Sequence, residues 1–283
     1  MQIEIVPFIA PMIDYENITV NRKNFDNRIA LIDADRYKHL VAYRIYQKLN
    51  EGYKHDIQLV EEVIDDYLTR DIFNMFSAKA YIFCFSAPSS NVFRNYLAQE
   101  KGYKANRKER EDPHYYEQKF SDMAHVYEYV NRRYPTLIFD DLEADDIVSF
   151  LQNDRTFIYS HDKDLKQVPG WHFDIDKYNL IEISKDEAYR SFIKQMYTGD
   201  STDNIPGIPG VGPKTVAKIF EDNNDIHSLI LTCFNDYIQK FGFVEGISTF
   251  VEMYSLIAMK IDRGEYFREK YKLAFSLRDS LLC

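Results

Sequence analysis

The chain of 283 residues contains few cysteines and no long apolar run. Its three cysteines, Cys84, Cys233 and Cys283, lack the spacing of a zinc site, and so small and odd a set suits a reducing cytoplasm. No apolar stretch is long enough to span a bilayer, and no signal-peptide pattern is present. We therefore expect a cytoplasmic protein that does not associate with a membrane.

An excess of positive charge is also lacking, because the formal net charge is −10. This balance argues against binding of nucleic acid by bulk charge. It leaves open a local basic groove beside acidic residues that gather around metal ions. A hydrophobic content of 45%, with 22 Tyr and 20 Phe, predicts a folded globule of one large domain or two.

Short apolar runs alternate with helical periodicity over the first two thirds of the chain. The predicted helices are Tyr37–Leu49 and Leu59–Ser77. The predicted strands are Arg28–Asp35, Ala80–Phe85, Thr136–Asp141 and Arg155–Asp162, with a final pair at His172–Asp176 and Leu180–Ile183. This alternation predicts an α/β fold with a mostly parallel central sheet. Residues 1–27 are interpreted as an extension, and from about Ser184 onward only helices are predicted.

Several of the predicted strands end in acid, and ligands of open α/β sheets bind outside the carboxyl ends of the strands. LEADDI adds three acids just after a strand, and GDSTDN adds two that share a face if that stretch is helical. One or two of these acids are also explained as helix caps. The full set is Asp33, Glu143, Asp145, Asp146, Asp162, Asp164, Asp200 and Asp203.

So many carboxylates repel one another at close range unless cations lie among them. Mg²⁺ or Mn²⁺ suits an all-carboxylate site, and two ions about 3.5–4 Å apart form the known clamp for phosphodiester hydrolysis. His161 lies inside SHDKDL, and without a partner it is interpreted as a packing residue.

The stretch GIPGVGPKT (207–215) breaks one predicted helix before another begins. Its glycines favour an anion-binding turn at a helix N-terminus, and a plain interhelical turn is the alternative. A nucleotide-binding P-loop is excluded because Pro213 separates Gly212 from Lys214.

A polar insertion, 92–133, carries the basic stretch EKGYKANRKERED around Tyr103. Its acids offset part of the charge, so a solvated helix face is slightly favoured on composition alone. The functional alternative is a phosphate-contacting element whose Tyr103 stacks on a base.

Taken together, the motifs resemble the flap endonuclease and 5′→3′ exonuclease family, most closely the exonucleases of T-odd bacteriophages. The matching stretches are LIDAD (31–35), YKANRK (103–108), LEADD (142–146), SHDKDL (160–165) and GDSTDNIPGIPGVGPKT (199–215). The resemblance implies a PIN-like nuclease domain at 28–185 with a helical arch at about 92–133. It implies a helical C-terminal domain at 186–283 with a helix–three-turn–helix motif that binds duplex DNA.

The resemblance also implies roles for individual residues. Asp33, Glu143 and Asp145 are expected to bind a first metal ion, and Asp162, Asp164, Asp200 and Asp203 a second, with Asp146 supporting both. The catalytic residues of the arch are expected to be Tyr103, Lys104 and Arg107. Nucleic acid is expected to contact Arg94, Lys101, Lys108, Gly207, Gly210, Gly212, Lys214 and Thr215, with a K⁺ ion at the turn.

The sequence departs from the family at Ala87, where an aspartate usually provides another ligand of the first metal. No acid occurs between Ala80 and Gln99. One explanation is weaker binding of the first metal. The favoured hypothesis is that Ala87 is a substitution made to stop cleavage.

The expected function is a 5′→3′ exonuclease and 5′-flap endonuclease that uses two Mg²⁺ or Mn²⁺ ions. Its expected partner is DNA with 5′ ends, flaps or a single-stranded 5′ arm, and nothing requires more than a monomer. The expected setting is phage DNA replication and degradation, including primer removal, in the host cytoplasm. The alternatives are a catalytically impaired binder of DNA structures and a ribonuclease acting on RNA–DNA hybrids.

Overall fold

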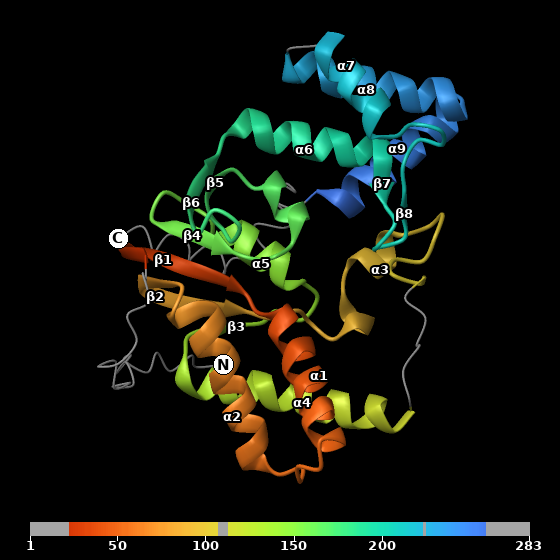
Figure 1. Ribbon diagram of the computed structural model, residues 1–283. Helices are drawn as coiled ribbons and strands as arrows, with labels where there is room; N and C mark the ends of the chain where they lie inside the picture. Colours follow the sequence, from red (N-terminus) through yellow and green to blue (C-terminus); the bar gives the residue numbers. More distant parts are fainter. Residues whose placement is uncertain (1–22, 107–112, 223–224, 259–283) are drawn as a thin grey trace.

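The computed structural model in Figure 1 describes residues 23–106, 113–222 and 225–258. A six-stranded sheet in the order β3-β2-β1-β4-β5-β6 forms its centre. The strands are β1 (Lys23–Asp33), β2 (Phe76–Cys84), β3 (Thr136–Leu137), β4 (Thr156–Tyr159), β5 (Gly170–Asp174) and β6 (Asn179–Ile183). The pairs among the first five strands are parallel, and only β6 runs antiparallel to its neighbour β5. The prediction of a mostly parallel sheet is confirmed.

Strand β1 occupies the middle of the sheet because its second half is apolar on both faces. Ala30, Leu31 and Ile32 have no exposed surface. The strand begins at Lys23 and not at Arg28, because polar residues extend the parallel ladder as far as the pair Lys23–Phe76. The predicted extension therefore overlaps β1, and its residues 1–22 lie outside the described residues.

One face of the sheet is covered by α1 (Asp35–Asn50), α2 (Ile57–Leu68) and α4 (Pro113–Arg133), which lie below the sheet in Figure 1. Aromatic rings of the strands pack against their apolar sides, in a core that includes Phe76 and Phe83. The predicted helix ending at Ser77 was too long. It ends at Leu68, and a π-helical turn (Thr69–Phe73) leads into β2.

The opposite face of the sheet is covered by α5 (Ala144–Leu151). Its buried residues Ile147, Val148 and Leu151 pack in one core with Leu31 and Ile158 of the strands. Three short helical turns lie beside it: η2 (Ser89–Asn91), α3 (Arg94–Leu97) and η3 (Lys163–Gln167).

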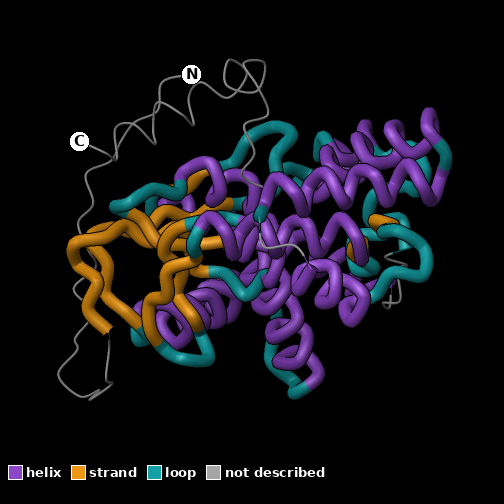
Figure 2. Tube along the Cα trace, turned by 90° about the horizontal axis from the view of Figure 1, so that it is seen from above, coloured by secondary structure: helices purple, strands orange, loops and turns teal. Residues whose placement is uncertain are grey.

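A third core joins the C-terminal helices α6 (Lys185–Thr198), α7 (Pro213–Asp222), α8 (Ile226–Phe241) and α9 (Phe243–Ile257). Helix α6 begins where predicted, because Ser184 and Glu187 form a capping box. The stretch GDSTDN is not helical. It forms the turn between two short antiparallel strands, β7 (Gly199–Asp200) and β8 (Ile205–Pro206). Figure 2 shows most of the strand residues on one side of the molecule and helices extending toward the other. None of the helices in the described ranges is long and apolar enough to cross a membrane.

Candidate metal centre

The carboxyl ends of β1 and β4 bring two predicted acidic segments together. Ile32 pairs with Tyr159, so the next residues along each strand, Asp33 and Ser160, are neighbours. The Ser160 hydroxyl donates a hydrogen bond of 2.7 Å to Asp33. Burial, together with the nearby charges of Asp35 and Asp162, raises the pKa of Asp33 to about 7. Asp33 is therefore a carboxylate that a cation at this edge would stabilise in its charged form.

The acids of η3 meet the acid of β7. Asp162 caps η3 by accepting a hydrogen bond of 2.8 Å from the backbone N–H of Asp164. Burial, a hydrogen bond to Asp200 and the charge of Asp162 raise the pKa of Asp164 to about 7. Although burial opposes it, the bonds from Asp164 and from the N–H of Thr202 lower the pKa of Asp200. The contact between Asp164 and Asp200 thus shifts their two pKa values in opposite directions.

Three acids gather at the N-terminus of α5. One ligand oxygen from each of Glu143, Asp145 and Asp146 lies within 4.8 Å of the others. Among the described residues, no other set of three or more His, Cys, Asp or Glu side chains has ligand atoms within this distance of one another. Burial and the charges of Asp146 and Glu143 raise the pKa of Asp145 well above its usual value. Repulsion of this kind favours binding of a cation.

Arg94 lies beneath these acids and does not face solvent. It is 1% exposed, and its guanidinium donates to both oxygens of Asp146, at 2.6 and 2.8 Å, and to Glu143 at 2.8 Å. Its Nε donates to the backbone oxygen of Leu256 in α9. The prediction that Arg94 contacts nucleic acid is therefore wrong: its donors are used inside the protein.

The same contacts give Asp146 a structural role. Its side chain is completely buried, and both of its oxygens accept from Arg94. Asp146 is a partner of that guanidinium and holds the start of α5, where its carboxylate also accepts from the N–H of Glu143. Its support of two metal ions stays a prediction, since one of its oxygens also lies within 4.8 Å of ligand oxygens of Glu143 and Asp145.

Tyr103 connects the acids of α5 with the turn after β7. Its hydroxyl lies 2.7 Å from Glu143 and 2.9 Å from Asp203. Burial and the two carboxylates keep its pKa above the usual range, so the hydroxyl stays protonated and donates. The ring is 8% exposed, which contradicts the alternative in which Tyr103 stacks on a base, and the catalytic role of Tyr103 stays a prediction. It orients carboxylates.

Lys104 is a second basic side chain that lies among the carboxylates. Its ammonium is 2.5 Å from Glu143 and 3.7 Å from Asp203. Although burial opposes it, these two charges raise the pKa of Lys104, so it carries a full positive charge at neutral pH. The catalytic role of Lys104 stays a prediction.

The chain around Lys104 is hydrogen-bonded to the β7–β8 turn. The N–H of Lys104 donates to the oxygen of Asp203 at 2.9 Å, and the Asn106 side chain donates to Ser201 at 2.6 Å. The Asn204 side chain donates in return to Gly102 at 2.8 Å. Sequence reasoning missed both asparagines. The predicted Arg107 and Lys108 lie outside the described residues, and the exposed Lys101 stays a prediction as a DNA contact.

The Gly/Pro turn leads into α7 at Pro213 as predicted. Gly210 has φ +87° and is exposed, and Lys214 and Thr215 are exposed in the first turn of α7. Gly212 has open space where a Cβ would lie, whereas a Cβ on Gly207 would meet the backbone of Tyr197 and Gly199. Gly207 therefore allows close packing of two backbones. Phosphate binding by the other positions stays a prediction.

Position 87 lies close to the α5 acids, as expected for a former ligand. Ala87 is 5% exposed, and its N–H donates to the oxygen of Leu142 at 2.8 Å. Asp35, which sequence reasoning left out, lies beside this segment and accepts from the N–H of Ser86 at 3.0 Å and from Lys38 at 2.7 Å. Its position two residues after Asp33 was the available signal. His161 is exposed, with its ring edge against Tyr159, and is not a core residue.

The whole arrangement fits a divalent cation that prefers oxygen. The donors are carboxylates, and the pKa values of Asp33 and Asp164 near 7 show how strongly the site disfavours their negative charge. The assignment of particular acids to a first and a second ion remains a prediction.

Comparison with known proteins identifies relatives of the chain. No protein-family model matches it. A 5′-3′ exonuclease of Buchnera aphidicola is 26% identical over 224 residues, covering 71% of this chain and 72% of the relative. The 5′-3′ exonuclease of Aquifex aeolicus is 30% identical over 111 residues, which is 34% of this chain and 38% of that protein. DNA polymerase I of Rhizobium leguminosarum is 36% identical over 111 residues, and the match spans only 11% of that polymerase.

Solved structures with the same fold come from bacteriophage T5. The T5 5′-exonuclease with bound zinc has a TM-score of 0.62 at 18% identity, covering 92% of this chain and 98% of that one. The T5 D15 flap endonuclease in a complex with DNA and metal ions has a TM-score of 0.58 at 17% identity, covering 91% and 100%. The chain is therefore similar in sequence to 5′-3′ exonucleases and has the fold of the T5 5′-exonuclease.

Proposed function

We propose that the protein is a divalent-metal-dependent 5′→3′ exonuclease and 5′-flap endonuclease that hydrolyses DNA phosphodiesters. The observation that carries this proposal is the position of Lys104 among carboxylates from two segments of the chain. Its ammonium lies 2.5 Å from Glu143, at the start of α5, and 3.7 Å from Asp203, in the β7–β8 turn. The named relatives and the metal-containing T5 structures support the same reaction.

The residues divide the chemical work between them. Asp33, Asp145 and Asp203 would offer oxygens to Mg²⁺ or Mn²⁺. Such ions, when bound, would supply the positive charge for activation of an attacking water and for stabilisation of the attacking and leaving oxygens. Lys104 offers a charge-assisted hydrogen bond to a phosphate oxygen as negative charge develops there. Tyr103 keeps Glu143 and Asp203 in position through its hydroxyl.

The helical module at 186–283 is proposed to hold the duplex beside this site. Lys214 and Thr215 lie exposed in the first turn of α7, where backbone N–H groups and the helix dipole favour a phosphate. A K⁺ ion at the preceding turn would add to that attraction. We propose that the protein is a monomer that acts in the cytoplasm, in DNA replication and primer removal. If the chain is phage-encoded, this is the cytoplasm of the host cell.

The direct test compares single-site variants on a 5′-flap DNA substrate with Mg²⁺ or Mn²⁺. Asp145→Ala and Asp203→Ala are expected to abolish cleavage while DNA binding remains measurable. The matched control is Asp66→Ala, because Asp66 is an exposed acid of α2 that belongs to none of these motifs. This variant should cleave normally. Normal cleavage by either of the first two variants would show that the site is wrongly assigned.

Ala87 favours a second candidate function, a protein that binds DNA structures without cutting them. A methyl group stands where the family usually has a ligand, and it lies against the segment that leads into α5. The wild-type chain would then bind the flap substrate but release no product with either ion. The same assay with an RNA 5′ strand on a DNA template separates a nuclease for RNA–DNA hybrids from one for DNA.

A further inference from the structure

The segment that carries Tyr103 and Lys104 to the acids of α5 has no regular structure of its own. Residues 98–106 form neither helix nor strand, so hydrogen bonds to other elements decide where they lie. Lys104 has a φ of +54°, in the left-handed region that residues with a side chain rarely adopt. Such a conformation persists only where the surrounding structure determines it. The position of the Lys104 ammonium therefore depends on what holds this segment.

Glu252 of α9 holds the beginning of the segment. Its Oε1 accepts from the backbone N–H of Gln99 at 2.6 Å and from that of Glu100 at 3.0 Å. The Glu100 carboxylate accepts in return from the hydroxyl of Thr249, one turn earlier in α9, at 2.8 Å. Thr249 is buried, so water competes little for this hydroxyl. The backbone and the side chain of Glu100 are thus both bonded to α9.

The contacts of α9 with the chain before Lys104 come from successive turns of that helix. Thr249, Glu252 and Leu256 follow one another at intervals of three and four residues, so they lie along one side of α9. The backbone oxygen of Leu256 accepts from the Arg94 guanidinium. One side of α9 therefore holds both α3 and the segment that leads from α3 to Lys104.

We propose that Glu252 is a positioning residue of the nuclease centre and acts through Lys104. Its bonds to Gln99 and Glu100 fix where the segment leaves α9, and the bond from the Lys104 N–H to Asp203 fixes where it reaches the β7–β8 turn. Only a short stretch of chain separates these two anchors, which leaves the ammonium little freedom to move away from the carboxylates. The role of Glu252 rests on the proposed function and adds to it a residue outside all the acidic motifs.

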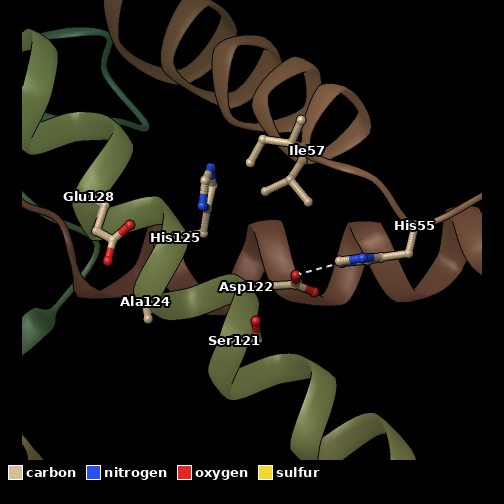
Figure 3. Close-up of a pocket in the computed structure, with 8 residues that line it drawn as sticks. His55, Ile57, Ser121, Asp122, Ala124, His125 and Glu128 are labelled. Atoms are coloured by element: carbon tan, nitrogen blue, oxygen red, sulfur yellow. Dashed lines mark hydrogen bonds and ion pairs between the residues drawn. The ribbon is translucent and has the colours of Figure 1, made fainter.

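The first measurement is the single-turnover rate of flap cleavage with Mg²⁺. Glu252→Ala should lower this rate about tenfold or more, because a misplacement of about 1 Å costs as much as about 10²-fold. Glu252→Gln should keep most of the rate, because its amide oxygen still accepts from both N–H groups. The matched control is Glu128→Ala, because Glu128 is an exposed glutamate of α4 that lines a pocket on the other face of the sheet (Figure 3). This control should cleave as wild type.

A double variant separates positioning of Lys104 from a general loss of stability. If Glu252 acts through Lys104, Glu252→Ala should change the rate by less than about twofold in a protein that already carries Lys104→Ala. The positioning role is overturned if Glu252→Ala alone cleaves as wild type, if Glu252→Gln loses as much rate as Glu252→Ala, or if Glu252→Ala lowers the rate by the same factor with and without Lys104.

A measurement without substrate is independent of the proposed function. In Glu252→Ala, the N–H of Lys104 should exchange with solvent deuterium about tenfold faster by NMR, the factor that loss of about one hydrogen bond gives to a local opening. Glu252→Gln should exchange there as wild type. Unchanged exchange at Lys104 in Glu252→Ala would overturn the positioning role. A wild-type protein that cleaved no flap would overturn the proposed function instead, and the exchange rates would still decide whether Glu252 holds Lys104.

Discussion

The Arg94 guanidinium donates to both carboxylate oxygens of Asp146, at 2.6 and 2.8 Å, with both side chains buried. This bidentate pair joins a residue of α3 to a residue of α5 that is 52 positions later in the chain. Because Glu143 accepts from the same guanidinium, the pair also fixes the residue that Tyr103 and Lys104 contact.

Removal of the Arg94 charge is expected to destabilise the protein strongly. Arg94→Met leaves Asp146 buried without its counter-ion, and breaking such a pair typically costs about 3–5 kcal/mol. Urea unfolding measures the loss. The double variant Arg94→Met/Asp146→Leu should lose less than Arg94→Met alone, because no charge is left unpaired. A double variant as unstable as the single one would contradict this account.

Lys104 is expected to contribute to cleavage more than to DNA affinity. Lys104→Ala should lower the rate of cleavage about 10²–10³-fold, the usual cost of removing one donor that stabilises developing charge. The matched control is Lys101→Ala, because Lys101 is exposed and three residues away. Single-turnover rates and flap-DNA affinity are measured for both variants. If both variants lost the same fraction of the cleavage rate, Lys104 would act only through its general positive charge and not through a specific contact with the reacting phosphate.

The pKa values at the site predict how stability depends on pH when a chelator removes divalent ions. The pKa of Asp33 is raised from 3.8 to about 7, so the folded protein keeps a proton that the unfolded chain releases. Its stabilisation is present at low pH and is lost as pH rises through about 7. The melting temperature should fall from about pH 5 to about pH 8, and Asp33→Asn should make that fall smaller. An Asp33→Asn profile as steep as wild type would contradict the assigned pKa.

Gly207 and Gly212 are expected to differ sharply in their tolerance of alanine. A Cβ on Gly207 would collide with backbone atoms of Tyr197 and Gly199, whereas none lies near Gly212. Gly207→Ala should cost about 1–3 kcal/mol or more. Gly212→Ala should stay within about 0.5 kcal/mol of wild type. Chemical denaturation of the two variants checks this, and equal stabilities would show that the turn relaxes easily.

A carboxylate at position 87 is expected to strengthen metal binding. Ala87 is buried against the segment that leads to Glu143, so Ala87→Asp adds a charged oxygen ligand close to those acids. Mn²⁺ affinity and the rate of flap cleavage should both rise, whereas Ala87→Asn, of similar size but uncharged, should raise the affinity less. No gain in either quantity would reject the view that this position lost a ligand.

The position of the site followed from the sequence because parallel strands end at one edge of a sheet. Acids after apolar runs therefore had to converge, and Asp33 and Asp162 do lie within electrostatic range of each other. Contacts between residues far apart in the chain left no such periodic signal. The burial of Arg94 and Tyr103 depends on partners 52 and 100 residues away. The β7–β8 hairpin was not predicted, because the three-residue separation of Asp200 and Asp203 fits one face of a helix as well as a tight turn.

The bond from Arg94 to the backbone oxygen of Leu256 has a consequence for recombination between related nucleases. A chimaera that takes its sheet from one parent and its last helices from another must place the backbone oxygen of residue 256 at the same position relative to Arg94. A shift of that oxygen would move the guanidinium and, with it, the side chains of Asp146 and Glu143. We therefore expect viable crossovers to keep α3, α5 and α9 from a single parent, so that the two halves of the molecule are inherited together.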